Sequence, residues 1–241
     1  MAAVSGGIGR IARPFLLLLP LAVAGCVAQT PPARILPVPA VTWSQQQMTE
    51  ILERTGHIRL APDISHLRPG ERLAVEKLIA VGRIFQDVYE DQRHRSALVA
   101  RSVLRPGSDE ATLYRLFQGP IATTLDNRRE PFLAVDEAPP GKNVYPWDLT
   151  REEYDLYLAA HPDEAEALTH LRSVVRRADA ASLRRDLDML DRYPVLDTLH
   201  PGLRLRLREL AKQPDRNRLY AAPYSLAYAD EMIRAHGLLN E

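Results

Sequence analysis

The stretch GERLAVEKLIAVGRIFQDVYEDQRHRSALVARSVL, residues 70–104, decides the fold. Its apolar residues recur at steps of three and four, the repeat of a helix with one buried face. They are Leu73, Leu78, Ile79, Ile84, Phe85, Val88 and Tyr89. Pro69 stands just before the stretch, where a first helical turn tolerates proline, and Pro106-Gly107 follows its end. We expect one long helix here, forming the spine of the domain.

Shorter helices are expected on both sides of this spine. Helical spacing is found in residues 43–54, 109–117, 183–190 and 223–239. In residues 203–210 arginine and leucine alternate with a period typical of a strand, but the composition and Leu210 favour a helix. A further helix should follow Thr150, because Thr150 and Glu153 form a capping-box pattern in which Thr150 accepts from the first turn and Glu153 reaches back.

Few strands are expected, and all of them are short. Residues 57–60 alternate as a short strand or an extended segment, and residues 170–177 and 219–222 are also expected to be extended. Residues 120–148 are punctuated by prolines and Gly141, which indicates a long irregular loop. We therefore predict a mainly α fold, with α+β as the alternative: a long central helix, packed shorter helices, few short strands and a long irregular middle loop.

The N-terminal 25 residues have the pattern of a bacterial lipoprotein signal. Arg10 and Arg13 precede an apolar run, residues 15–24, that is too short to cross a bilayer. The run ends in Val23-Ala24-Gly25-Cys26, which resembles a lipobox, and Cys26 is the only cysteine in the sequence. We predict that residues 1–25 are cleaved and that Cys26 carries the lipid. An ordinary signal with an incidental cysteine is the alternative.

The remainder divides into a tether and one domain. Residues 26–41 contain four prolines, which indicates a stiff, extended tether behind the lipidated cysteine. Residues 42–241 are expected to form one mainly helical domain. The sequence has 31 basic and 31 acidic residues, and this balance argues against nucleic acid as a partner. Val27 is not the aspartate that retains lipoproteins in the inner membrane, so the outer membrane, facing the periplasm, is the expected location.

Catalytic motifs are missing from the sequence. It contains no serine in a Gly-x-Ser-x-Gly elbow and no phosphate-binding Gly-x-x-x-x-Gly-Lys loop, and Cys26 is consumed by the lipid. No two histidines are three or four residues apart, the spacing that suits zinc on a helix. The weak metal candidates are His161, Glu164 and His170. The alternative is a helix start, with Pro162 in the first turn followed by acidic residues.

Two other features can be interpreted as contact surfaces. Asn143, Tyr145 and Trp147 lie in the irregular loop and are a candidate binding surface, although the aromatic rings can equally fill the domain's own core. A basic run can meet anionic lipid or a partner; it comprises Arg172, Arg176, Arg177, Arg184 and Arg185. Acidic residues between these arginines favour a solvated, ion-paired face instead.

Several motifs resemble bacterial relatives of dipeptidyl peptidase III, the M49 group of metallopeptidases. The most specific is PGKNVYPWDLTREE, residues 140–153, which is similar to a pattern Gly-x-Asn-Phe-Tyr-Pro-x-Asp-Leu-Thr-x-Glu-Glu in those relatives. Others are Gly119-Pro120, LDN at 125–127, PFL at 131–133, QDVYEDQ at 86–92, VVRR at 174–177 and LYAAPYS at 219–225. The resemblance covers residues 57–239 and implies the non-catalytic N-terminal part of such a peptidase.

The departures from that pattern bear on function. Ile121 replaces a tryptophan, and residues 180–215 look like an extra arginine- and leucine-rich segment. In the family, the zinc-binding His-Glu-x-x-x-His helix comes after the region matched here. The sequence ends at Glu241 without it, so no catalytic residue is carried over. We expect either a stand-alone version of the N-terminal region or a truncated product.

Three functions remain open on the sequence alone. The first is a membrane-anchored envelope lipoprotein that binds peptide or protein without catalysis and needs no cofactor, with the lipid membrane as a partner through Cys26. The second is a metallopeptidase, or a fragment of one that lacks its zinc motif. The third is a purely structural envelope lipoprotein.

Overall fold

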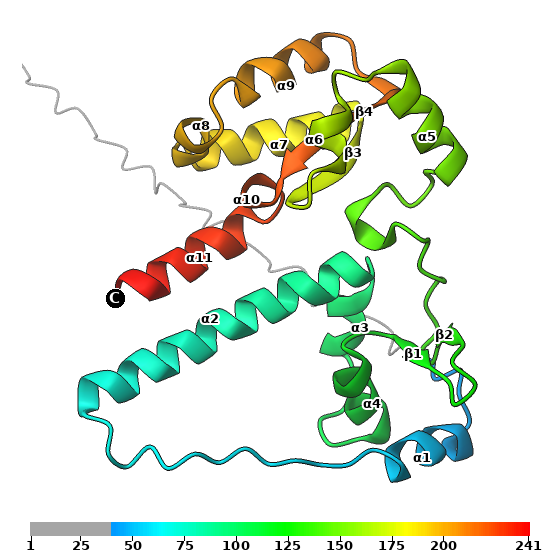
Figure 1. The fold of residues 1–241 in the computed structure, drawn as a ribbon, viewed down its shortest axis with the longest axis vertical. Coiled ribbons are helices and arrows are strands. Elements are labelled where there is room, and N and C mark those ends of the chain that lie inside the picture. The colour runs from blue at the N-terminus through cyan, green and yellow to red at the C-terminus, as the bar shows by residue number, and fades with distance from the viewer. Residues whose placement is uncertain (1–39) are drawn as a thin grey trace, which may run out of the picture. The chain divides into compact units, whose positions relative to one another are not determined.

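The computed structural model describes residues 40–241. The predicted signal, Cys26 and nearly all of the tether lie outside the described residues. Residues 40–241 are mainly α, as predicted, with eleven α-helices, one 3-10 helix and two antiparallel sheets of two strands each (Figure 1). Within this range, no helix combines the length and the apolar character that crossing a bilayer requires.

The predicted spine is confirmed as α2 (Pro69–Arg93), but it ends earlier than expected. His94 is extended and only 1% exposed, and α3 (Ala97–Ser102) follows as a separate helix. The His94 ring explains the break, because Nδ1 accepts from the Ser96 amide at 3.0 Å and Nε2 lies 2.9 Å from the Asp136 carbonyl oxygen. Burial lowers the pKa of His94, which keeps this ring neutral at neutral pH.

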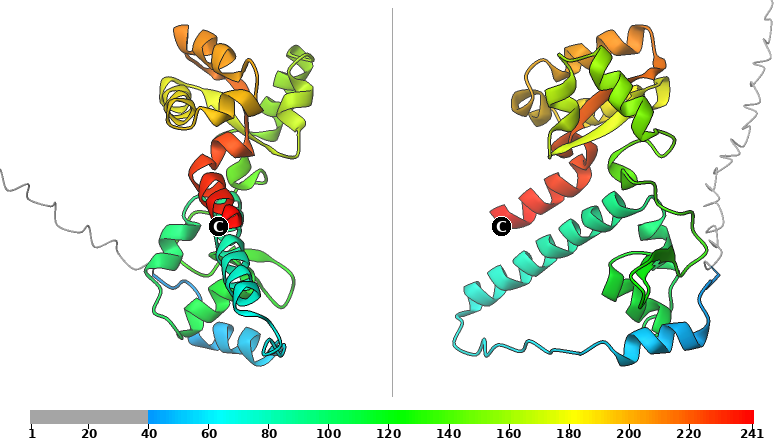
Figure 2. Two further views of the ribbon diagram at one scale, coloured as in Figure 1. Left: turned by 90° about the vertical axis from the view of Figure 1, so that its left-hand side faces the viewer. Right: turned by 45° about the vertical axis from the view of Figure 1, so that its right-hand side comes forward.

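Helix α2 packs along the last helix, α11 (Ala229–Asn240). Figures 1 and 2 show the two helices side by side. Val81 and Ile84 of α2 and Ala235 of α11 form one buried cluster. Lys77 and Glu241 form an ion pair between the two helices. The C-terminal end of the described residues is thus held against the first half of the spine.

One core lies between α1 (Gln45–Glu53) and α4 (Asp109–Phe117). Both helices were predicted. The loop expected over residues 120–148 is less irregular than predicted, because β1 (Ile121–Thr123) and β2 (Arg129–Pro131) pair in it as an antiparallel hairpin. Phe132 and Leu133 follow this hairpin and are fully buried, and their burial anchors it.

Residues 57–60 form no strand. The side chains of Ile58 and Leu60 are both 88% exposed, and no neighbouring strand meets this segment. Alternating residues stabilise a strand only when another strand supplies hydrogen bonds and a surface to pack on. Residues 57–60 form no strand because that pairing is missing within residues 40–241.

A second core surrounds a two-stranded sheet. The predicted extended segments are confirmed as β3 (Ser173–Ala178) and β4 (Asp215–Pro223), which pair antiparallel with Val175 opposite Ala221. The helices around them are α5 (Arg151–Ala160), α6 (Ala165–Thr169), α7 (Ala180–Arg192), α8 (Val195–Leu199) and α9 (Leu203–Lys212). Helix α8 was not expected, because five residues are too few for a clear repeat.

The segment of alternating arginine and leucine forms a helix, as its composition indicates. In α9, Leu203, Leu207 and Leu210 are buried in the core with α7, whereas Leu205 is 65% exposed. Steps of four and three place the buried leucines on one face, and Leu205 falls on the other.

The predicted final helix is divided in two. It consists of α10 (Tyr224–Ala227) and α11, with Tyr228 between them in a non-helical conformation. The ring of Tyr228 is buried against Val88 of α2 and Val174 of β3. The chain leaves the helical path at this point so that the ring fills the space between spine and sheet.

Candidate functional site

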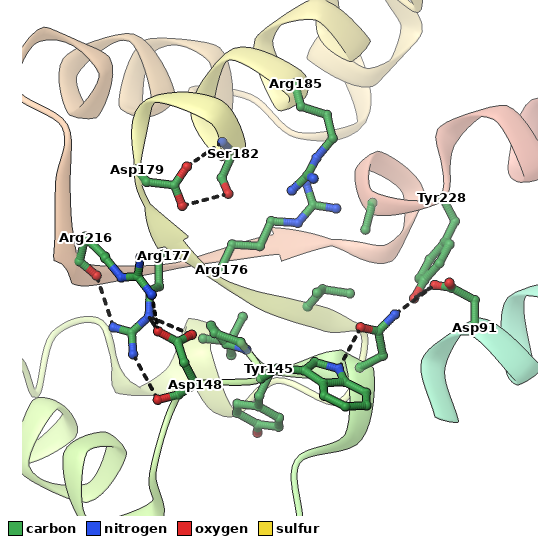
Figure 3. A pocket seen from close by; sticks show the side chains of 16 residues that line it. Asp91, Tyr145, Asp148, Arg176, Arg177, Asp179, Ser182, Arg185, Arg216 and Tyr228 are labelled. Atoms are coloured by element: carbon green, nitrogen blue, oxygen red, sulfur yellow. Dashed lines mark hydrogen bonds and ion pairs between the residues drawn. The ribbon is translucent and has the colours of Figure 1, made fainter. Parts of the chain in front are cut away.

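A pocket of about 480 Å³ lies along β3, and we call it the β3 pocket. Its walls come from the end of α2, the segment after the 3-10 helix η1 (Lys142–Val144), strand β3, the start of α7 and the turn at Tyr228 (Figure 3). The lining residues are Asp91, Asn143, Tyr145, Pro146, Trp147, Asp148, Val174, Val175, Arg176, Arg177, Asp179, Ser182, Arg185, Arg216, Ala227 and Tyr228. Guanidinium, carboxylate and aromatic groups therefore share one cavity.

A chain of polar and aromatic contacts holds Trp147 in place. Its indole N–H donates to Asn143 Oδ1 at 3.1 Å. The Trp147 ring meets the edge of the His94 ring at 5.0 Å between centroids, and the Arg95 guanidinium lies 4.1 Å from its centroid. The break at the end of α2 therefore supports the pocket wall directly.

The three residues predicted as a binding surface all line the β3 pocket. Asn143, Tyr145 and Trp147 are half-buried there. Tyr145 also packs edge-on against Tyr154 of α5, with 5.2 Å between centroids, so its ring belongs partly to the core. A Cβ at Gly141 would lie 2.9 Å from the Tyr145 Cβ, and this close approach explains the glycine. Ligand binding by these residues stays a prediction.

Arg177 connects three segments at one end of the pocket. Its side chain is 8% exposed, and it donates to Asp148 at 3.0 and 3.1 Å and to Glu153 at 2.8 and 3.1 Å. Arg216 donates to the same Asp148 at 2.6 Å. The hydrogen bond from Arg177 lowers the pKa of Glu153. Two guanidinium groups and two carboxylates thus balance one another here.

This cluster corrects the predicted capping box. Thr150 does cap α5, accepting from the Glu153 amide at 3.0 Å. Glu153 does not complete the box, because its carboxylate is bound to Arg177 across the domain. An ion pair with a nearly buried guanidinium has displaced a local hydrogen bond.

The prediction of a solvated face is wrong for the centre of the basic run, because the side chains of Arg176 and Arg177 are largely buried. Asp186 of α7 is 1% exposed, pairs with Arg176 and accepts from the Tyr220 hydroxyl at 2.7 Å. Arg185, which is 57% exposed, approaches the same carboxylate to 3.9 Å. Side chains alternate along a strand, so Arg176 faces α7 and its neighbour Arg177 faces α5. Two guanidinium groups therefore share one buried carboxylate beside the pocket.

Asp91 lies at the opposite end of the lining, at the end of α2 (Figure 3). Its Oδ2 accepts from Asn143 Nδ2 and from the Tyr228 hydroxyl, both at 3.3 Å. Burial raises the pKa of Asp91 because the charged form loses hydration. Asp91 lies in the segment 86–92 quoted above, but no local pattern marked it as a site residue, because its partners come from elements far along the chain.

The weak metal candidates are not brought together. His161 stacks on Tyr157 with 4.1 Å between centroids, and Glu164 accepts from the Tyr157 hydroxyl at 2.7 Å and from Arg218 at 3.1 Å. His170 is exposed and accepts from the Arg172 amide. No three potential metal ligands converge within residues 40–241. The alternative interpretation predicted a helix start here. A helix does follow, but α6 begins at Ala165, after a turn at Pro162.

One serine–histidine contact, between Ser225 and His200, was not predicted from the sequence. His200 Nε2 lies 2.6 Å from Ser225 Oγ, although the two residues are far apart in the chain. A catalytic triad also needs a carboxylate on the other ring nitrogen. No such contact to His200 occurs within the described range, and the pair lies outside the β3 pocket. The contact therefore connects α8 to α10, but it lacks the carboxylate that a catalytic triad needs to activate the serine.

Comparison with known proteins places this fold beside one solved structure. No family model matches the chain, and neither does any curated protein sequence. DPP III from Caldithrix abyssi is similar, with 25% identity and a TM-score of 0.52 over 73% of this chain. This similarity supports a DPP III-like relationship. The chain spans 27% of the length of the DPP III chain that it matches.

Proposed function

We propose that this chain is a lipid-anchored envelope protein whose DPP III-like module binds peptides in the β3 pocket without cleaving them. The relationship to DPP III supports a peptidase-related module. The peptide-binding role, the missing catalysis and the lipid anchor are parts of the proposal.

The open edge of β3 carries the peptide-binding proposal. Strand β3 pairs with β4 on one edge, and no strand of residues 40–241 pairs with its other edge. Four consecutive residues, Val174 to Arg177, line the pocket. If the side chains of one strand face alone lined the pocket, only every second residue of β3 would border it. Because four consecutive residues do, the backbone of β3 also borders the cavity. An extended peptide that adds to this edge gains backbone hydrogen bonds in the way other proteins bind strands.

The pocket also offers groups that suit a peptide's other atoms. The exposed guanidinium of Arg185 has donors for peptide carbonyl or carboxylate oxygens. The rings of Tyr145 and Trp147 offer apolar faces for side chains. A structural spacer has no need of such a cavity, which makes the purely structural role the less favoured alternative.

A random mixture of hexapeptides tests peptide binding. The protein is expected to enrich peptides from the mixture, and Arg185→Ala should weaken their binding about two- to tenfold, the loss that one hydrogen-bonding group brings. The measurement is affinity capture read by mass spectrometry, followed by titration of an enriched peptide. Arg184→Ala is the matched control, because Arg184 is the exposed neighbour on α7 and does not line the pocket. Equal weakening by both changes, or no enrichment, rejects the peptide site.

A peptidase, or part of one, is the second candidate, because the similar protein is a DPP III. The same captured peptides decide between the two. Under the proposal they are recovered intact, with or without added zinc. Cleavage that a chelator abolishes, together with zinc bound in about one-to-one ratio, favours the peptidase.

Lipid anchoring is tested through Cys26. In bacteria grown with a labelled fatty acid, the wild-type chain is expected to take up the label and to sediment with membranes, because several acyl chains on one residue anchor stably. Cys26→Ala should lose the label and leave the membrane fraction. An intact mass without lipid on the wild-type protein would contradict the lipoprotein proposal.

A further inference from the structure

Asp91 is a half-buried carboxylate that borders the β3 pocket and forms no ion pair within residues 40–241. The side-chain hydrogen bonds that it accepts in this range come from Asn143 and Tyr228. The carboxylate next to it in the chain, Glu90, pairs with Arg101 at 2.8 Å. Asp186, which is buried beside the pocket, pairs with Arg176. Asp91 differs from both because no guanidinium or ammonium group of the described chain reaches it.

The carboxylate of Asp91 has spare acceptor capacity. Both hydrogen bonds reach the same oxygen, Oδ2, and both are long, at 3.3 Å. Within the described residues, Oδ1 accepts no hydrogen bond. An ionised carboxylate offers about four acceptor sites on its two oxygens, so room remains for a donor with several N–H groups.

The charges around Asp91 favour a cation. Of the two nearby charges, Glu231 of α11 raises the pKa of Asp91 more than Arg176 of β3 lowers it. The charge of Arg176 is already matched by Asp186. Burial raises the pKa of Asp91, and a cation that binds there would stabilise the ionised form.

The neighbouring groups indicate an organic cation. The aromatic residues Tyr145, Trp147 and Tyr228 line the same pocket, and Figure 3 shows the Tyr228 hydroxyl directed at Asp91. An ammonium group gains from a carboxylate and from the faces of aromatic rings together. A metal ion needs several carboxylate or imidazole ligands, and no such group of three exists within residues 40–241.

We propose that Asp91 is the subsite for an organic ammonium group of the ligand, either the amino terminus of a peptide or the side chain of a lysine. The proposal rests on the proposed peptide-binding function of the β3 pocket. Asn143 and Tyr228 hold the carboxylate in position from one side, and the ammonium group donates to its free oxygen. The ligand's charged end is thereby placed at the α2 end of the pocket, and its backbone continues along β3.

Four hexapeptides of otherwise identical alanine, valine and leucine sequence test this subsite. One has a free amino terminus, the second is acetylated, the third is acetylated and contains one lysine, and the fourth is acetylated and contains acetyl-lysine. Tryptophan fluorescence reports binding to the full-length protein, because Trp147 lines the pocket and the other tryptophan, Trp43, is buried in the core beside Phe132. The free or the lysine peptide is expected to bind at least about tenfold more tightly than the two without an ammonium group. Tighter binding of the free peptide identifies an amino terminus as the source of the ammonium group. Tighter binding of the lysine peptide identifies a lysine side chain.

The variant Asp91→Asn separates charge from shape. The amide keeps an oxygen for Asn143 and Tyr228, but the preference for an ammonium group is expected to fall below about twofold. Asp188→Asn is the matched control, because Asp188 is exposed on α7, does not line the pocket and removes the same charge. It should keep the tenfold preference. If Asp91→Asn fails to fold, the four peptides on the wild-type protein still decide.

The outcomes distinguish this subsite from the proposed function. Equal binding of all four peptides overturns the ammonium subsite and leaves peptide binding intact. If no peptide binds, n-butylammonium chloride is titrated by NMR, with n-butanol as the control. Binding of the ammonium salt alone, lost in Asp91→Asn, supports the subsite and overturns the peptide function. No binding of either probe overturns both.

Discussion

Replacing Asp186 by alanine is expected to lower the free energy of unfolding by about 3–5 kcal/mol, the loss typical when one partner of a buried ion pair is removed. The Asp186 side chain is 1% exposed and that of its partner Arg176 is 13% exposed. Without the carboxylate, the guanidinium stays buried and unpaired, and the Tyr220 hydroxyl loses its acceptor. Urea unfolding followed by circular dichroism measures the change.

Two further variants make this result specific. Asp188→Ala on the same helix removes an exposed carboxylate and should change stability by less than about 0.5 kcal/mol. The double change Arg176→Met with Asp186→Leu should regain most of the loss, because an apolar pair of similar volume leaves no charge unpaired. A loss below about 1 kcal/mol for Asp186→Ala, or a double variant as unstable as the single one, would contradict the role of this pair.

Leu207→Ala should destabilise the protein by about 2–5 kcal/mol, and Leu205→Ala should have almost no effect. Leu207 is fully buried with Leu183 and Leu190, so the shorter side chain leaves a cavity. Leu205 is 65% exposed. The comparison uses the same substitution two residues apart, and thermal or urea unfolding measures both.

This pair also tests the helical assignment of the alternating segment. In a strand, residues 205 and 207 would share a face and the two changes would have similar effects. In α9 they lie on different faces, and the effects should differ by several-fold. Equal losses in the two variants would therefore reject the helix.

The pocket was only partly visible in the sequence. Asn143, Tyr145 and Trp147 stood out because polar and aromatic residues in a proline-rich loop are unusual, and the structure places all three in the β3 pocket. Arg185 stood out only as one member of the basic run, and Asp91 did not stand out as a candidate site residue. Asp91 lies in the long helix among other charged residues, and only the fold brings Tyr228, 137 positions away, to its carboxylate.

Local periodicity determined which segments are helical, because a helix needs its apolar residues on one face and that spacing is written in the chain. The spine and the helices α1, α4 and α7 follow from it, whereas α9 followed from composition and against the alternating pattern of its residues. The ends of the elements depended on distant partners. Helix α2 stops where the His94 ring meets the carbonyl of Asp136, and Glu153 leaves its own helix cap for Arg177, 24 positions away. Such contacts between distant residues exist only after the helices and strands have packed, so no local pattern records them. Only the tertiary structure decides where α2 ends, which partner Glu153 takes and which side chains form the pocket.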